Sequence, residues 1–201
     1  MAKIKQYKIA RRLGVRIFPK TENPKFTPTR ARRTKKYSRP MSEFGLQMLE
    51  KQKARYGYGL RERQFANYVA KATARKDVNS MEYLYRMLES RLDNIVYRLG
   101  FAKTRAFARQ MVSHGHIVVN KRKNSIPSYE VKIGDVISLR GASRGTHMGE
   151  AVALRVKEYI PPVWLSLDVK NMEGTMKAAP PLEEYSGSLF NLSSIIEFYS
   201  R

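Results

Sequence analysis

Arginine, histidine and asparagine side chains gather in one short segment whose spacing suits phosphate chemistry. Arg105 and Arg109 are four positions apart, so on a helix both project from one face. A chain reversal at Gly115 would bring His116 and Asn120 beside that helix. Arginine binds phosphate oxygens through paired hydrogen bonds, and asparagine and histidine can hydrogen-bond a sugar hydroxyl or a base edge. The segment therefore indicates RNA binding, with an ordinary solvated helix face as the alternative.

Two further pairs of residues have spacings known from catalytic or metal sites. His114 and His116 form a His-x-His pair, but a metal site needs three or four ligands, and the chain contains no cysteine. Glu89 and Asp93 are carboxylates four positions apart, which general acid–base catalysis could use. Three arginines lie near them in sequence, so we expect these carboxylates to orient arginines instead. The sequence thus predicts no catalytic residue, no metal and no cofactor.

The overall charge points to a polyanionic partner. The chain has 201 residues, of which 39 are Lys or Arg and 17 are Asp or Glu, and its formal net charge is +22. Residues 1–40 alone contain 14 bases and one acid. Such a segment repels itself unless a polyanion neutralises it, and nucleic acid fits best. An anionic membrane is the weaker alternative, because residues 1–40 have no clear amphipathic face to insert into it. No stretch of the chain approaches the roughly 18 apolar residues of a membrane span.

Helical spacing predicts four helices in the first half of the chain. They are expected from a cap at Ser42 to Tyr56, from Arg61 to Lys76, from a cap at Asn79 or Ser80 to Gly100, and from a cap at Thr104 to Ser113. The third carries a leucine and isoleucine stripe with a spacing of about 3.6 residues. The basic residues that precede these helices are expected to be extended or irregular.

After residue 115 the pattern changes to that of short strands. The sequence predicts strands over residues 117–119, 128–133 and 136–139, a flexible connection over 141–149 and a helix over 150–159. The final apolar cluster around Ile195 is expected to dock onto a core. The predicted fold class is α+β, with two helices packed on a small antiparallel sheet in the middle of the chain.

Several of these segments together resemble a known family. They are Tyr56–Gly57, Glu62–Phe65, Glu89–Phe101, Thr104–Asn120, Ile126–Tyr129, Trp164–Asp168 and Ile196–Arg201. The central ones resemble the S4 RNA-binding domain, and the flanking ones extend the resemblance to the ribosomal protein S4 family of the small subunit. Residues 42–140 match well, and the C-terminal part matches in two patches. Matches on both sides of the RNA-binding domain are more specific than that domain alone.

The resemblance implies an α-helical domain that is interrupted by an inserted S4 RNA-binding domain. On this basis we expect a basic N-terminal arm (1–41), a discontinuous helical domain (42–87 and 160–201), the RNA-binding domain (88–140) and a connection (141–159). Three features depart from the family pattern, and one of them is that residues 141–160 match it poorly. Family members often begin with a zinc-binding cysteine cluster, which this chain lacks, and Lys121 stands where the family usually has glycine.

The resemblance also implies a function. We expect a structural rRNA-binding protein of the small ribosomal subunit that is not an enzyme. It would bind the 5′ domain of the rRNA, nucleate assembly, and help to form the region where mRNA enters. Ribosomal proteins S3 and S5 and the mRNA are the further partners implied, on a ribosome in the cytoplasm or in an organelle. A stand-alone RNA-binding factor for ribosome rescue or stress is the alternative; an enzyme would need a catalytic domain for which the chain is too short.

Basic and polar residues along much of the chain are expected to contact the rRNA. The arm contributes Arg11, Arg12, Arg30, Arg32, Arg33, Lys35 and Lys36; the first helices contribute Lys51, Lys53, Arg55, Arg61 and Arg63; the RNA-binding domain contributes Arg91, Arg98, Lys103, Arg105, Arg109, His116, Asn120, Lys121 and Arg122. Together they would form a bipartite basic surface that recognises the shape of a folded RNA.

Overall fold

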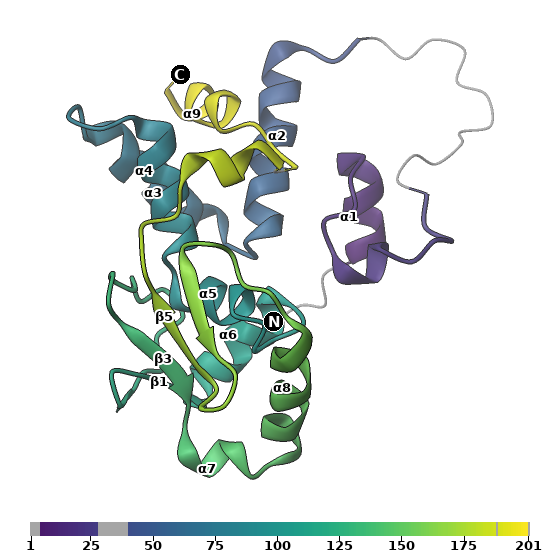
Figure 1. Cartoon of the computed structure of the whole chain (residues 1–201). Coiled ribbons are helices and arrows are strands. Elements are labelled where there is room, and N and C mark those ends of the chain that lie inside the picture. Colours follow the sequence, from purple (N-terminus) through teal and green to yellow (C-terminus); the bar gives the residue numbers. More distant parts are fainter. Residues whose placement is uncertain (1–4, 28–39, 188, 201) are drawn as a thin grey trace. The chain divides into compact units, whose positions relative to one another are not determined.

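The computed structural model describes residues 5–27, 40–187 and 189–200 (Figure 1). The chain divides into two compact units. The helical unit consists of Met1–Met81 and Gly187–Arg201, and the sheet unit consists of Glu82–Ser186. The central segment therefore folds as an insertion between two parts of the helical unit, which confirms the predicted α+β class with an interrupted helical domain.

Helices with one buried apolar face build the helical unit. They are α1 (Gln6–Leu13), α2 (Glu43–Gly57), α3 (Glu62–Ala74) and α9 (Leu192–Ser200), with the 3-10 turn η1 (Pro19–Thr21), and α4 (Ser80–Glu89) begins in this unit and ends in the other. The Ser42 hydroxyl accepts a hydrogen bond from the Gly45 amide and starts α2 as predicted. Phe65, Val69 and Ala72 form the buried face of α3.

The described part of the N-terminal arm is more regular than the sequence predicted. Instead of being extended, it contains α1, which buries Ala10 and Leu13. Ala10 also joins Phe18 and Phe26 in a small apolar cluster, against which the ring of Tyr56 packs. These isolated apolar residues look like spacers between basic residues in the sequence, and only their long-range packing makes them a core.

The C-terminal helix α9 docks onto α2 and α3, as its apolar sequence predicted. Leu192 and Ile195 are fully buried. The ring of Phe198 lies 5.2 Å from that of Phe44 on α2, measured between centroids. The Tyr199 hydroxyl donates a hydrogen bond of 2.7 Å to a carboxylate oxygen of Glu62, which is on α3. The end of the chain thus completes the core of the helical unit.

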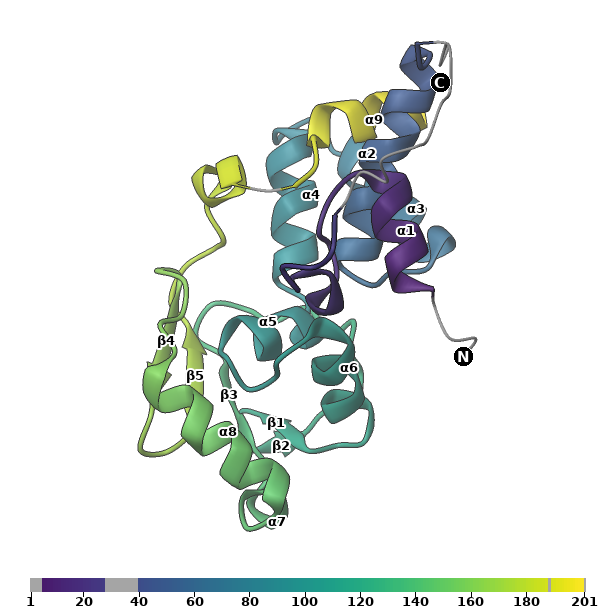
Figure 2. The ribbon, with the colours of Figure 1, turned by 90° about the vertical axis from the view of Figure 1, so that its right-hand side faces the viewer.

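Helices α5, α6 and α8 share one apolar core with a five-stranded sheet in the sheet unit (Figure 2). The elements are α5 (Leu92–Arg98), α6 (Arg105–Ser113), β1 (Ile117–Val119), β2 (Arg122–Lys123), β3 (Val136–Leu139), α7 (Gly141–Arg144), α8 (His147–Glu158), β4 (Leu165–Asp168), β5 (Glu173–Met176) and η2 (Leu182–Gly187). The strand order is β2-β1-β3-β5-β4, and every pair is antiparallel.

The register places the apolar residues of the sheet on one face. Val119 pairs with Ile137, and Ile137 pairs with Gly174 on the next strand, so the three lie on the same side. A Cβ atom at Gly174 would overlap the side chain of Leu99, the residue that caps the end of α5, so this part of the chain packs tightly on the sheet at the glycine. Side chains at alternate positions, among them Val118, face away from these helices.

The predicted helix from residue 80 to Gly100 is interrupted, because its backbone bonds to another segment. Helix α4 ends at Glu89, and Arg91 is extended and forms an isolated bridge with Glu130. The Leu92 amide donates to the Tyr129 carbonyl. The apolar stripe continues across the break, which is why spacing alone missed it. The strand predicted over residues 128–133 was also wrong, since this bridge is its only ladder contact in the described chain.

Two other predictions about the second half need correction. Residues 141–149 are not a flexible connection: they form α7 and the start of α8, where the Thr146 hydroxyl accepts from the Gly149 amide. Residues 160–186 were expected in the helical domain, but β4 and β5 extend the sheet. Their register places Leu165 and Met176 in the core of the sheet unit, so only the last residues return to the helical unit.

Candidate nucleic-acid interface

A buried carboxylate, Glu89, organises the first group of arginines. Its side chain is fully buried at the end of α4. Its two oxygens accept hydrogen bonds of 2.9 Å from Nε and Nη2 of Arg98, the last residue of α5. The side-chain amide of Asn94 donates a further bond of 2.8 Å to Glu89. A buried carboxylate is stable only when it is paired in this way, so the arginine is fixed along with it.

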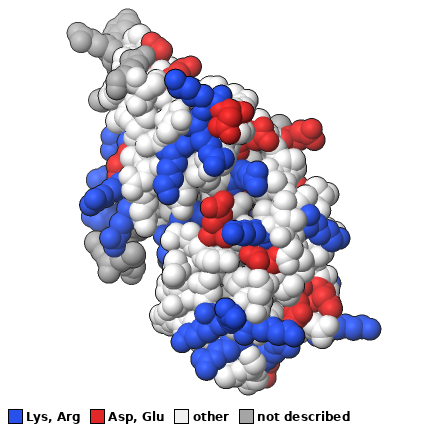
Figure 3. Space-filling model, turned by 90° about the vertical axis from the view of Figure 1, so that its left-hand side faces the viewer, with Lys and Arg blue, Asp and Glu red and all other residues white. Residues whose placement is uncertain are grey.

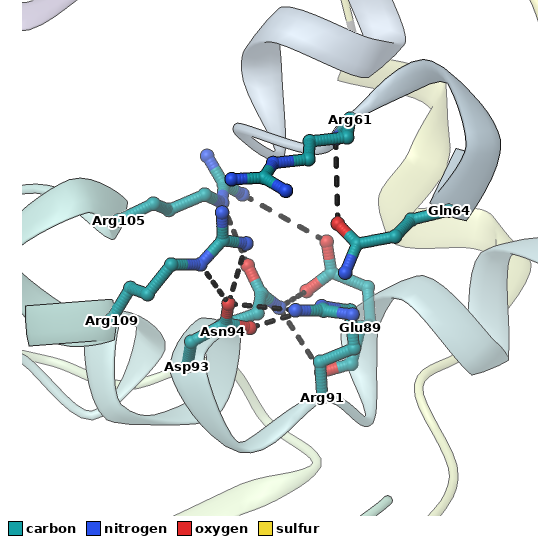
Figure 4. Close-up of polar contacts among 8 residues, drawn as sticks. All are labelled: Arg61, Gln64, Glu89, Arg91, Asp93, Asn94, Arg105 and Arg109. Atoms are coloured by element: carbon teal, nitrogen blue, oxygen red, sulfur yellow. Dashed lines mark hydrogen bonds and ion pairs between the residues drawn. The ribbon is translucent and has the colours of Figure 1, made fainter. Parts of the chain in front are cut away.

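Asp93, in the first turn of α5, forms a second centre. Arg91 donates two hydrogen bonds to it, of 3.0 and 2.8 Å, and Arg109 on α6 donates two more, of 2.9 and 2.7 Å (Figure 4). The Arg91 side chain is only 4% exposed, whereas that of Arg109 is 27% exposed. The predicted orienting role of the two carboxylates is thus what the geometry shows.

Arg105 completes the group from the first turn of α6. Its Nε donates a bond of 2.7 Å to the side-chain oxygen of Asn94, and its guanidinium lies 4.6 Å from the centroid of the Tyr97 ring. The Thr104 hydroxyl caps α6 by accepting from the Phe107 amide, as predicted. We call Arg98, Arg105 and Arg109, with Glu89 and Asp93, the arginine network.

The three guanidinium groups of the arginine network are held in place by carboxylates and are partly open to solvent. Each of its three arginine side chains is between 25% and 30% exposed, so each has one side against the protein and one side toward solvent. With Arg91 included, four guanidinium groups meet two carboxylates, and an excess of positive charge is left. Guanidinium groups that are already oriented lose little conformational entropy when they bind phosphate.

The chain reversal predicted at Gly115 is present, with a left-handed φ of 73° that suits glycine. It leads into β1 and brings His116 and Asn120 into the same unit as α6. Nδ1 of His116 lies 2.9 Å from the Ser143 hydroxyl, and the ring is half-buried. The Asn120 side chain bonds to Asp135 and to the Val136 amide. Both residues therefore serve local structure through their polar atoms.

Among the predicted contacts that the structure describes, Arg91 and Lys51 are too buried to contact RNA. Arg91 is 3% exposed as a residue, so an RNA could not reach its guanidinium. Lys51 is 7% exposed, and its ammonium lies 2.7 Å from Glu62 and 4.7 Å from the centroid of the Phe198 ring. These two cations stabilise the protein, and we leave them out of the interface. Lys51 lies on a helix that has charged residues on more than one face. In such a helix the sequence does not show which basic residues are buried.

The other predicted cations of the helical unit differ in their surroundings. Lys53 forms an ion pair of 2.6 Å with Glu50, and Arg55 stacks at 4.1 Å from the centroid of the Tyr56 ring. The exposed ones are Arg11, Arg12, Arg61 and Arg63. Arg30, Arg32, Arg33, Lys35 and Lys36 lie outside the described residues.

The contacts around Glu62 shift the pKa values of Glu62 and of Tyr199. Burial alone would raise the pKa of Glu62, but hydrogen bonds from Lys51 and Tyr199 and the charges of Lys51 and Arg55 outweigh it, so the pKa lies below its ordinary value. Burial, with the hydrogen bond to Glu62, raises the pKa of Tyr199 well above its ordinary range. These shifts belong to packing of α9, and they mark no catalytic group.

Exposed cations of the sheet unit include some that the sequence analysis passed over. Lys103, Lys121 and Arg122 are exposed as expected, and so are Lys123 and Arg140. Figure 3 shows a group of lysine and arginine side chains at the bottom of the view. Lys123 continues the run of Lys121 and Arg122, so the run itself was a signal for it.

Neither a metal site nor a membrane span is found in residues 5–27, 40–187 and 189–200. No group of three or more His, Cys, Asp or Glu residues there is arranged to hold a metal ion. Within the same residues, no helix is long and apolar enough to cross a membrane.

Two known domain families match the chain. Residues 2–89 match the ribosomal protein S4/S9 N-terminal domain, and residues 90–137 match the S4 domain. A small ribosomal subunit protein uS4 of Chloroflexus aurantiacus is 45% identical over 199 residues, which cover 96% of each chain. The uS4 protein of Aquifex aeolicus is 43% identical over 202 residues, covering 96% of this chain and 95% of its own. That of Chromobacterium violaceum is 50% identical over 162 residues, covering 80% and 77%.

Proposed function

This chain belongs to the ribosomal protein S4 family, and we propose that it is a structural constituent of the small ribosomal subunit that binds the subunit's rRNA. The observation that carries the proposal is the arginine network, in which buried Glu89 and Asp93 hold three partly exposed guanidinium groups in place. The relatives bear the name of the same subunit protein over nearly the full length of this chain.

In this proposal the protein binds the 5′ domain of the small-subunit rRNA, nucleates its assembly, and contributes to the region where mRNA enters. The chemistry is binding without catalysis. The net charge of +22 supplies the long-range attraction to RNA, and the oriented arginines supply the specific phosphate contacts. Ribosomal proteins S3 and S5 and the mRNA are the proposed neighbours, and the cytoplasm, or an organelle that makes its own ribosomes, is the proposed location.

Loss of the α6 arginines tests the proposal. Arg105→Ala combined with Arg109→Ala should weaken binding to a 5′-domain rRNA fragment by about 1–3 kcal/mol per lost contact. The fold should survive, because Arg91 still pairs with Asp93 and Arg98 still pairs with Glu89. Binding is measured by filter retention at fixed salt, and folding by circular dichroism.

The matched control removes two other cations from the same unit. Lys170 and Lys177 are exposed near β4 and β5, so Lys170→Ala combined with Lys177→Ala causes an equal loss of charge. This control should change affinity far less than the α6 variant. Equal weakening by both pairs would mean that only total charge matters, and it would remove the arginine network from the binding surface.

A further inference from the structure

The turn between β1 and β2 holds a lysine in a backbone conformation that glycine normally occupies. Asn120 has a φ of 49° and Lys121 a φ of 65°, so both are left-handed. They form the two-residue loop between Val119 and Arg122, which are cross-strand partners. Such loops with two left-handed residues favour Asn followed by Gly. Asparagine is therefore well suited to its place, whereas the Cβ atom of Lys121 introduces strain.

The turn is tied to the rest of the sheet unit and cannot easily relax this strain. The Asn120 side chain donates a hydrogen bond of 2.7 Å to Asp135 and accepts one of 2.9 Å from the Val136 amide. The Asn120 backbone amide donates a third bond to the Val136 carbonyl. Asn120 therefore acts as a positioning residue: it fixes the hairpin against the start of β3.

The fixed turn presents three consecutive cations. Lys121, Arg122 and Lys123 are all exposed. Arg122 pairs with Val119, whose side chain faces the core, and Lys123 pairs with Val118, which faces the opposite way. Because cross-strand partners lie on the same face, the two β2 cations project to opposite sides and Lys121 stands at the tip.

Protection of a sheet edge explains only part of this arrangement. Strand β2 is at one end of the strand order, and charges on edge strands prevent pairing with other chains. This accounts for Arg122 and Lys123. It does not account for Lys121, which lies in the turn, where glycine would leave the edge unchanged and relieve the strain.

We propose that the β1–β2 hairpin is a rigid phosphate-binding tip in which Lys121 binds an RNA phosphate, and that this contact is the reason for a strained lysine in the turn. The inference rests on the proposed function, because it takes RNA as the ligand. It predicts that stability and binding change in opposite directions at one residue, which no purely structural role for Lys121 would produce.

Three substitutions at Lys121 separate charge from backbone strain. Lys121→Gly should raise the Tm of the full-length protein by about 2–4 °C, because it relieves the strain. It should also weaken binding to the 5′-domain rRNA fragment roughly fivefold and reduce the slope of log K against log salt by about 1. Lys121→Ala keeps the strain and removes the charge, so it should weaken binding equally without raising Tm. Lys121→Arg should keep both the affinity and the wild-type Tm.

The outcomes distinguish the inference from the function on which it rests. If the wild type binds the rRNA fragment no better than an unrelated structured RNA of equal length, the proposed function fails. If the wild type is selective and Lys121→Gly binds with unchanged affinity and salt slope, the inference alone is overturned. A fall in Tm for Lys121→Gly would likewise overturn it, because the lysine would then be stabilising the turn.

Discussion

At the scale of single residues, the carboxylates of the sheet unit matter as much as its arginines. Glu89 and Asp93 stood out in the sequence as an acidic pair that could support catalysis or orient arginines. Their burial and their hydrogen bonds to Arg98 and Arg109 settle this in favour of orientation. The sequence could predict the pairing, because the residue types and helical spacing were visible. It could not predict that Arg91 is buried, because that depends on a backbone bridge to Glu130.

Removal of the Asp93 charge should destabilise the protein strongly. In Asp93→Asn, the buried guanidinium of Arg91 loses its carboxylate partner, and breaking a buried ion pair by removing one partner typically costs about 3–5 kcal/mol. Urea denaturation measures the change in the free energy of unfolding. The control is Glu130→Gln, a loss of one acidic charge at an exposed position. A similar small effect of both substitutions would show that Arg91 does not depend on Asp93.

At the scale of elements, local signals predicted some helices and missed others. The caps at Ser42 and Thr104 and the buried stripe of α3 were visible in the sequence, and those helices were confirmed. The break after Glu89 and strands β4 and β5 were missed. Short strands and interrupted helices are decided by hydrogen bonds to distant segments, and one sequence does not reveal these.

The docking of α9 should depend on pH through Glu62. A carboxylate whose folded-state pKa is lowered stabilises the protein above its ordinary pKa of about 4.5, and this contribution is lost as the pH falls through the lowered value. Tyr199→Phe removes one hydrogen bond that lowers this pKa. The variant should be less stable at neutral pH, because this hydrogen bond is lost. The loss should be at most about 1 kcal/mol, because Glu62 is half exposed and solvent screens its interactions.

Urea denaturation at two pH values measures this difference. The gap between Tyr199→Phe and the wild type should shrink as the pH falls through the lowered pKa of Glu62, because the carboxyl group is then protonated in both proteins. Tyr7→Phe, which removes an exposed hydroxyl elsewhere in the helical unit, should show no such pH dependence. A gap that stays constant with pH would mean that the Glu62 carboxylate does not couple to α9.

At the scale of the whole molecule, the positive charge is unevenly distributed along the chain. Residues 1–40 contain 14 bases and one acid, whereas residues 141–201 contain 6 bases and 7 acids. General attraction to RNA therefore resides in the N-terminal part, and oriented guanidinium groups lie in the sheet unit. A protein that neutralises about 8 phosphates should lose affinity with log salt at a slope of several units.

Selective binding of the small-subunit rRNA is the property that separates this role from general attraction to polyanions. The measurement is filter binding of the purified protein to a 5′-domain rRNA fragment across a salt series, beside an unrelated structured RNA of equal length. A preference of about a hundredfold or more that persists at moderate salt is the predicted result. Equal affinity for both RNAs, falling together as salt rises, would contradict it.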